Sequence, residues 1–339
     1  MEITVKYYER TSIGRQTIMK EYIGNSAQLF EVKQYTLTDG RANGTRAISV
    51  WNGAGLTYTL LPDRCLDIAD VRFNGNNMSY LTPSGIVNPM YFEADGTNWL
   101  RSFAGGFLTT CGLENIGGTD DTPGLTMHGR IGNMPCDNVC CDLAPDGMSA
   151  TISGTAKEAT LFGCKLTLRR TYECAYGEDK ITFTDVITNN GFDRIPVSAL
   201  YHMNLGYPLL SEKAKLVVPS VEVTPRNEHA ANHVADWNKL VPPQHGFEEM
   251  CYYHKLSENC YGIDNPAIGV SMRISFESDG MLDRLIQWRM LGECEYVMGL
   301  EAASCTLEGR KDAVANGSQK YLEPGQSFTN RFTITFKAI

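Results

Sequence analysis

Three side chains that can carry or move protons stand in apolar or glycine-rich stretches of the chain. They are His128 in TMHGR, His202 in LYHMNLGYPLL and Glu301 in EYVMGLEAASC. A carboxyl group in apolar surroundings has a raised pKa, and an imidazole can give or take a proton near neutral pH, so the set suits general acid–base catalysis. Plainer interpretations remain open: a core histidine satisfied by a carbonyl, and a glutamate that turns outward at a strand end.

The stretch around His202 has the pattern of a strand with two different faces. Alternation places Leu200, His202 and Asn204 on one face and Tyr201 and Met203 on the other. Buried polar side chains need hydrogen-bond partners, so the face of His202 and Asn204 is expected to line a site or to be satisfied within the core.

Two further polar clusters contain side chains of types that can bind hydroxyl groups. The glycine-rich segment 101–133 contains Arg101 and Arg130 as well as His128, and the alternative for it is a solvated loop. The segment LPDRCLDI places Arg64 between Asp63 and Asp67. Read as a strand, it puts both Asp side chains on one face, typical of a structural ion pair, although the same groups could hold a sugar hydroxyl.

Signals for a metal or a nucleophile are weaker. His229 and His233 are four residues apart, but Ala230 stands where a zinc protease of the HExxH type has its Glu. The cysteines in 136–141 lack the paired spacing of a structural zinc site, and no GxSxG motif is present. Cys111 remains open as a nucleophile, while no metal and no cofactor are expected.

Composition excludes some partners. The chain of 339 residues is 42% hydrophobic and carries 39 acidic against 30 basic side chains, for a net charge of -9. Such a chain forms a packed interior, and its surface repels phosphate backbones, so we expect no nucleic acid and no membrane as partners. Eleven cysteines without an export signal indicate reduced thiols, and therefore a cytoplasmic protein. We expect it to be a monomer or a homodimer.

The sequence pattern is that of an all-β protein. Short runs such as LTYTLL, KITFTDVIT and RFTITF are separated by turn residues, and Leu166, Leu168, Arg170 and Tyr172 alternate with polar neighbours. This pattern predicts an antiparallel sandwich or barrel. No linker or repeat interrupts it, so residues 1–339 are expected to form one domain.

A few segments do not follow this pattern of short strands and turns. Residues 1–45 are expected to form edge strands, one over Ile3–Tyr8 and another over Gln28–Thr38. Pro89–Phe103 is expected to form a helical turn or a lid, and Glu228–Leu240 is the best helix candidate.

Taken in order, these stretches resemble the aldose 1-epimerases (galactose mutarotases). The resemblance is carried by LPDRCLDI, RSFAGGFLTTCGLENIG, TMHGR, YHMNLGYPLL and GLEAASC, and by the closing LEPGQSFTNRFTITF, from about residue 55 onward. It implies a β-supersandwich of large twisted antiparallel sheets with an open sugar cleft. It also implies an isomerase that interconverts sugar anomers by opening and reclosing the ring.

The resemblance also implies roles for individual residues. Glu301 is the expected base, His202 the expected acid, and His128 the group that binds near the ring oxygen, with the catalytic pair held across the pyranose. The side chains expected to hold sugar hydroxyls are Arg64, Asp67, Arg101, Arg130 and Asn204. Ring opening is already fairly quick in water, so neither a metal nor an organic cofactor is implied.

The chain departs from the better-known mutarotases next to the first histidine. Arg130 stands where they have a glycine, which would favour an acidic, phosphorylated or keto sugar over a plain aldose. Two alternatives therefore stay open. One is a metal-assisted epimerase, isomerase or eliminase with His128, His202 and Glu301 as ligands, and the other is a non-catalytic carbohydrate-binding protein.

Overall fold

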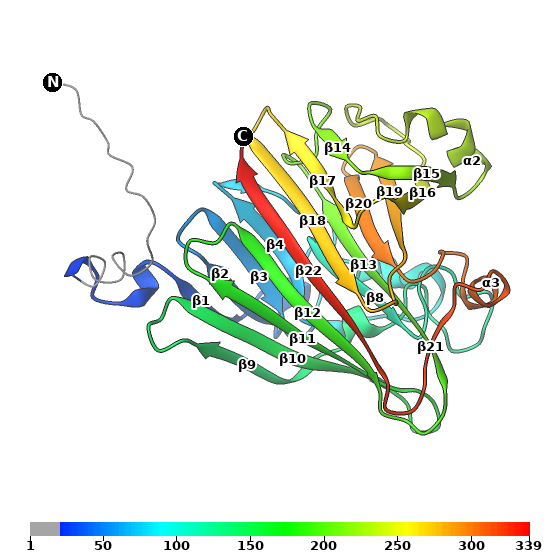
Figure 1. The fold of residues 1–339 in the computed structure, drawn as a ribbon, viewed down its shortest axis with the longest axis horizontal. Coiled ribbons are helices and arrows are strands. Elements are labelled where there is room, and N and C mark those ends of the chain that lie inside the picture. The colour runs from blue at the N-terminus through cyan, green and yellow to red at the C-terminus, as the bar shows by residue number, and fades with distance from the viewer. Residues whose placement is uncertain (1–20) are drawn as a thin grey trace.

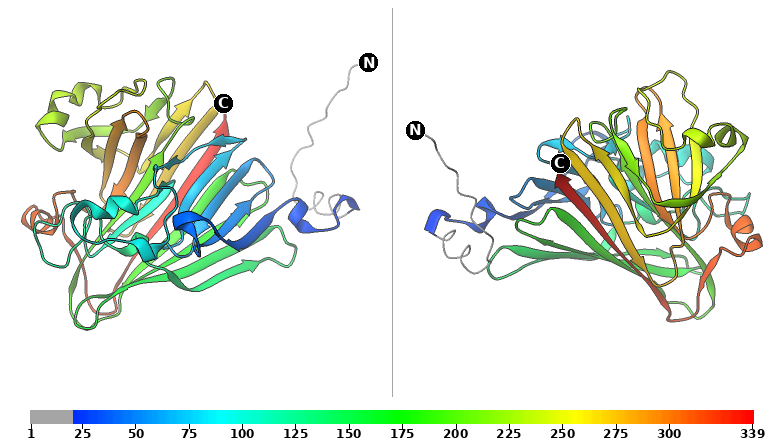
Figure 2. Two further views of the ribbon diagram at one scale, coloured as in Figure 1. Left: turned by 180° about the vertical axis from the view of Figure 1, so that it is seen from behind. Right: turned by 45° about the horizontal axis from the view of Figure 1, so that its top comes forward.

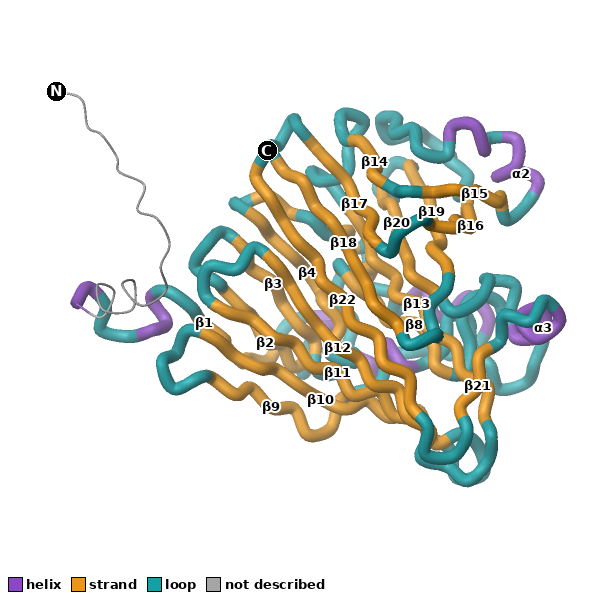
Figure 3. Tube along the Cα trace, viewed as in Figure 1, coloured by secondary structure: helices purple, strands orange, loops and turns teal. Residues whose placement is uncertain are grey.

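The structure, a computed structural model, describes residues 21–339, and most of its regular elements are β-strands paired antiparallel (Figures 1 and 3). The strand expected at Ile3–Tyr8 lies outside the described residues. The first sheet has the order β1-β2-β3-β4-β5 and contains β1 (Glu31–Thr36), β2 (Arg46–Trp51), β3 (Leu56–Leu61), β4 (Asp67–Phe73) and β5 (Asn76–Asn77). The strand expected within 28–38 is thus β1, at the edge of this sheet.

The second sheet is the largest and has the order β14-β17-β18-β22-β12-β11-β10-β9. Its strands are β9 (Cys136–Leu143), β10 (Ser149–Ala159), β11 (Lys165–Ala175), β12 (Lys180–Asn189), β14 (Lys215–Val217), β17 (Cys260–Asn265), β18 (Val270–Ser278) and β22 (Ser327–Ala338). On β11 the predicted alternation is confirmed, since Leu166, Leu168, Arg170 and Tyr172 are all buried.

The third sheet carries the residues of the candidate site. Its order is β15-β16-β19-β20-β13-β21, and β8 also pairs with β13. Its strands are β8 (Leu108–Leu113), β13 (Ile195–Leu205), β15 (Ser220–Pro225), β16 (Met250–Leu256), β19 (Arg284–Leu291), β20 (Tyr296–Ala303) and β21 (Lys320–Leu322). Two short strands, β6 (Tyr80–Leu81) and β7 (Gly105–Gly106), pair with each other nearby.

The two faces of β13 pack against different groups of side chains, as the alternation predicts. Tyr201, Met203 and Leu205 belong to the main hydrophobic core, to which all three large sheets contribute. Leu200 belongs instead to a smaller apolar cluster that includes Ile286. The face that carries His202 and Asn204 is therefore directed away from the main core.

The helices that lie wholly within the described residues are short. They are α2 (Glu228–Asn232), α3 (Arg310–Ala315) and 3₁₀ turns at Ser26–Gln28, Gly40–Ala42, Pro89–Tyr91, Gly96–Arg101, Ile131–Asn133 and Val234–Asp236. The helix expected over 228–240 is thus shorter than predicted: Asn227 caps its start by accepting from Ala230 N at 2.8 Å, and it ends at Asn232. No helix among the described residues has the length and apolar character needed to cross a membrane.

The loops between β6 and β9 supply the remaining parts of the site. In the view from behind, these loops lie in front of the large second sheet (Figure 2, left). The segment 89–103 contains two of the 3₁₀ turns, in agreement with the expected helical turn. The segment 62–66 is a turn with Cys65 and Leu66 at positive φ, so the strand reading of LPDRCLDI is wrong.

Candidate active site

One row of side chains crosses five strands of the third sheet. The register pairs Tyr253 with Ile286, Ile286 with Glu301, Glu301 with His202 and His202 with Thr109. Directly opposite residues of an antiparallel pair direct their side chains to the same face. The sheet therefore places Glu301 beside His202, although 99 residues separate them in the chain.

The two groups are in contact and almost fully buried. His202 Nε2 lies 3.3 Å from Glu301 Oε1, and the residues are 5% and 1% exposed. The contact lacks the alignment of a hydrogen bond, since Glu301 Oε1 has no hydrogen-bond partner among the described residues, and neither does His202 Nδ1. Unsatisfied polar atoms are rare in protein interiors, so their occurrence on these two neighbouring residues makes the pair a candidate site for a polar ligand.

Burial favours the uncharged form of both groups. It raises the pKa of the Glu301 carboxyl well above the usual range, and the negative charge of Glu249 adds to this effect. Burial, together with the neighbouring His128, lowers the pKa of His202 to about 3. The short contact is therefore between a carboxylic acid and a neutral imidazole rather than an ion pair.

His128 lies beside His202. Its ring centroid is 5.8 Å from that of His202, and its φ is +58°. Gly117 N donates to its Nδ1 at 3.4 Å, while burial and the positive charge of Arg226 lower the pKa of His128 to about 4. A neutral ring that accepts at Nδ1 carries its proton on Nε2, so His128 can donate a hydrogen bond from that atom.

Aromatic rings surround the two histidines. The ring centroids of Phe103 and Trp288 each lie 5.4 Å from that of His202, and the ring of Trp99 lies 4.9 Å from that of His128. Rings of this kind offer apolar surface to the C–H face of a sugar while leaving polar edges for its hydroxyls.

Asn204, predicted as a hydroxyl ligand, lies next to the pair. It is fully buried on the same face of β13 as His202, and its Nδ2 donates to Gly105 O and His202 O. Its Oδ1 has no partner among the described residues. The structure thus brings Asn204 together with His128, His202 and Glu301.

Asp67, predicted to bind a hydroxyl, is already engaged by other partners. Its Oδ1 accepts from Arg170 Nη1 at 2.7 Å and from Thr110 Oγ1 at 2.6 Å, and its Oδ2 accepts from Thr110 N at 2.8 Å. Arg170 also binds Asp185 through two nitrogens, all inside the core. Because its oxygens are already engaged, Asp67 holds β4, β8 and β11 together, and we withdraw the expectation that it binds a sugar.

The three arginines predicted as ligands are not in contact with the pair. Arg64 is buried, donates to Val87 O at 2.9 Å, and borders a small hollow together with Thr109. It pairs with neither flanking aspartate, since Asp63 binds Arg46 instead. The guanidinium of Arg130 lies 6.0 Å from the ring of Phe92, and the exposed Arg101 ends a 3₁₀ turn.

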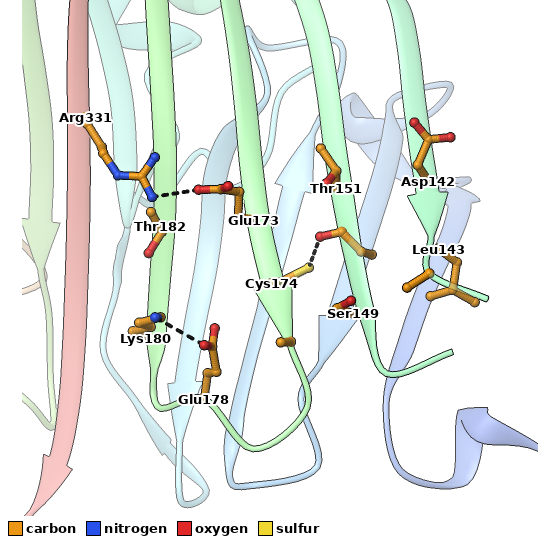
Figure 4. Close-up of a pocket in the computed structure, with 13 residues that line it drawn as sticks. Asp142, Leu143, Ser149, Thr151, Glu173, Cys174, Glu178, Lys180, Thr182 and Arg331 are labelled. Carbon is orange, nitrogen blue, oxygen red and sulfur yellow. Dashed lines mark hydrogen bonds and ion pairs between the residues drawn. The ribbon is translucent and has the colours of Figure 1, made fainter. Parts of the chain in front are cut away.

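A larger hollow lies along β9–β12, away from these residues (Figure 4). Four of the charged groups that line it are paired with one another: Arg331 with Glu173 at 2.7 Å, and Lys180 with Glu178 at 3.1 Å. Among residues 21–339 no three His, Cys, Asp or Glu side chains are grouped to hold a metal ion. The thiol of Cys111 is buried, which raises its pKa well above the usual range.

Comparison with known proteins agrees with this arrangement of sheets. A family model described as "Domain of unknown function (DUF4432)" matches residues 42–336. The chain belongs to this family. A comparison of this family member with curated proteins gives no match.

Solved structures similar to this DUF4432 member share its fold. A "putative aldose 1-epimerase" from Klebsiella pneumoniae subsp. pneumoniae MGH 78578 is 26% identical, with a TM-score of 0.85, over 91% of this chain and 83% of that chain. The galactose 1-epimerase from Lactobacillus acidophilus NCFM is 13% identical, with a TM-score of 0.60, over 91% and 99%. A "putative mutarotase" from Salmonella typhimurium is 10% identical, with a TM-score of 0.62, over 95% and 100%. The predicted resemblance and the galactose mutarotase-like β-supersandwich are confirmed.

Several residues of the site were not found from the sequence of this family member. Trp288 and Gly299 lie on β19 and β20, opposite each other in the register, and no local pattern marks either one. Glu249 accepts from Trp288 Nε1 at 2.6 Å just before β16 begins. Trp99 and Phe103 stand in a segment that was expected to form a turn or lid, and this was the only signal for them.

Proposed function

We propose that the chain is a carbohydrate isomerase that interconverts sugar anomers, an aldose 1-epimerase, with Glu301 and His202 as its catalytic pair. One observation carries the proposal: a buried carboxyl and a buried imidazole lie 3.3 Å apart, and neither Glu301 Oε1 nor His202 Nδ1 has a hydrogen-bond partner among the described residues. The likeness in fold to proteins named as aldose 1-epimerases gives separate support.

The chemistry needs an acid and a base at the same time. Ring opening removes the proton of the C1 hydroxyl while the ring oxygen receives one; the C1–C2 bond then rotates and the steps reverse. A protonated carboxyl beside a neutral imidazole supplies one acid and one base, and the two exchange roles once each has transferred a proton. Each positioned transfer typically contributes a factor of about 10² to 10⁴.

The spacing of the pair determines how a sugar would approach. A pyranose ring does not fit between atoms 3.3 Å apart, so the expectation of a pair held across the ring is replaced by a pair side by side. This arrangement suits the reaction because the C1 hydroxyl and the ring oxygen are both bonded to C1. One edge of the sugar then meets both catalytic groups.

The pKa shifts suggest which group acts first. With Glu301 protonated and His202 neutral, Glu301 donates to the ring oxygen and His202 takes the C1 hydroxyl proton. This order reverses the one inferred from the family resemblance. Reclosure of the ring then proceeds with the two roles exchanged, which returns the proton to Glu301.

The neighbouring groups would orient the sugar. His128 can donate from Nε2, and Asn204 offers its unsatisfied Oδ1 to a hydroxyl. The rings of Phe103 and Trp288 can contact the apolar face of the sugar. Holding C1 against the pair in this way converts binding energy into correct orientation.

The proposal is tested by measuring anomer exchange with NMR magnetisation transfer over a panel of aldoses, keto sugars, uronates and sugar phosphates. At least one sugar should exchange much faster with the protein than in buffer alone. Saturable binding without acceleration would replace the proposal with a carbohydrate-binding protein. Stoichiometric metal in the purified protein, with activity lost on chelation, would replace it with the metal-assisted reaction.

A further inference from the structure

The carboxyl of Glu301 occupies the space where residue 299 would carry a side chain. Gly299 stands two residues before Glu301 on β20, so the two share a face of the strand. A Cβ atom built on Gly299 would lie 2.2 Å from Glu301 Oε1 and 3.0 Å from Trp288 Cβ. The first distance is far below any real contact, so a side chain and this position of the carboxyl exclude each other.

The backbone itself does not require glycine at this position. Gly299 is absent from the residues of positive φ, where glycine is favoured for conformational reasons. It pairs with Trp288 on β19 and with Asn204 on β13 in ordinary antiparallel register. Glycine in the interior of a strand weakens it and often marks a close approach by another group. Here that group is the Glu301 carboxyl.

The space above Gly299 is closed on both sides. On one side Trp288 is held by its 2.6 Å hydrogen bond to Glu249 Oε2. On the other side Asn204 is held by two hydrogen bonds to backbone oxygens. In the structure the Glu301 carboxyl lies over Gly299, with its Oε1 at 3.3 Å from the imidazole of His202.

We propose that Gly299 is a positioning residue for the catalytic pair: the absence of its side chain lets the Glu301 carboxyl lie against His202. The inference rests on the proposed function for its effect on rate, but not for its effect on geometry. The clashing atom is the far end of a flexible side chain, so Gly299→Ala can be accommodated by a new Glu301 rotamer. The variant should therefore fold while its acid group is misplaced.

The test combines Gly299→Ala with a shorter acid at position 301. We expect Gly299→Ala to lower kcat by about 100-fold, the order of loss that follows a misplacement of about 1 Å. In Glu301→Asp the carboxyl is withdrawn from the space above Gly299, so adding Gly299→Ala should cost less than about threefold more, a strong non-additivity. Equal losses in both backgrounds, or wild-type kcat in Gly299→Ala, would overturn the proposal.

Gly118→Ala is the matched control. A Cβ at Gly118 meets nothing closer than 3.6 Å and its φ is not positive, so this variant should keep wild-type kcat and thermal midpoint. If Gly118→Ala loses as much as Gly299→Ala, the effect is one of added bulk and the inference fails.

A second measurement separates this inference from the proposed function. In ¹⁵N-histidine NMR, the His202 ring nitrogens should report the titration of Glu301 in the wild type and lose this step in Gly299→Ala. Loss of the step in a protein that accelerates no sugar would support the positioning and contradict the function. An unchanged step in Gly299→Ala would contradict the positioning whatever the activity.

Discussion

His202 and Glu301 face each other across β13 and β20, with Nε2 of the imidazole 3.3 Å from Oε1 of the carboxyl. The sheet register fixes this relationship, because directly opposite side chains on neighbouring antiparallel strands point to the same face. Burial disfavours the charged form of both groups, raising the pKa of Glu301 and lowering that of His202, so the strands hold a proton donor beside a proton acceptor.

The pH range over which kcat/KM is constant should extend to unusually acidic pH. The pair works while it holds one proton, and a second proton binds only when His202 is protonated, at about pH 3. His128 stays neutral down to about pH 4. Activity is therefore expected to stay level as the pH falls to about 5, with the limb on the alkaline side set by the raised pKa of Glu301. An acid limb with its midpoint near 6.5 would contradict these assignments.

Stability must be followed in the same experiment. The pKa values of His128 and His202 are lower in the folded protein than the ordinary 6.5, so the unfolded chain binds more protons below that pH. Their contribution to the free energy of unfolding is thus present above pH 6.5 and lost as the pH falls toward 4 and 3. Circular dichroism at each pH shows which part of any acid loss is unfolding.

Glu249→Gln should shift the alkaline limb to lower pH. The Glu249 charge raises the pKa of Glu301, second only to burial, and glutamine keeps an oxygen to accept from Trp288 Nε1. Glu249 is exposed, so the shift should be largest at low ionic strength and shrink at about 1 M salt, where screening is strong. Identical alkaline limbs for wild type and variant at low salt would refute the interaction.

Asp67→Asn should reduce stability without changing sugar affinity. The variant removes a charge that faces Arg170 inside the core, and breaking such a buried pair costs about 3 kcal/mol of unfolding free energy. The control is Asp63→Asn, whose partner Arg46 is 44% exposed, so its cost should be below about 1 kcal/mol. A raised KM with unchanged denaturant stability in Asp67→Asn would return Asp67 to the sugar site.

The local sequence pattern was sufficient to predict most of the strands and the polar face of β13. Alternation alone put His202 and Asn204 opposite Tyr201, and it also put Arg170 among inward-facing residues of β11. Each of these inferences needs only the two-residue period of a strand. The same rule failed at LPDRCLDI, because positive φ at Cys65 turns the chain there.

Partners that depend on strand pairing could not be read from local sequence. The acceptor for Arg170 in β4 is 103 residues away, so Asp67 looked free to bind a ligand when it was not. That Gly299 and Trp288 lie opposite each other follows only from the register of β19 with β20. Such pairings are set by how whole sheets pack, and the one-residue shift that would reverse every face leaves no mark in a single strand.

The most direct test of the central claim is anomer exchange by NMR with Glu301→Gln and His202→Gln, using the sugar that the wild type exchanges fastest. Glu301→Gln preserves the shape of the side chain and His202→Gln keeps a neutral polar side chain, while both remove an acid–base group, so the fold should persist by circular dichroism. We predict that each lowers the catalysed rate by at least about 100-fold. Wild-type exchange rates in both folded variants would contradict the account.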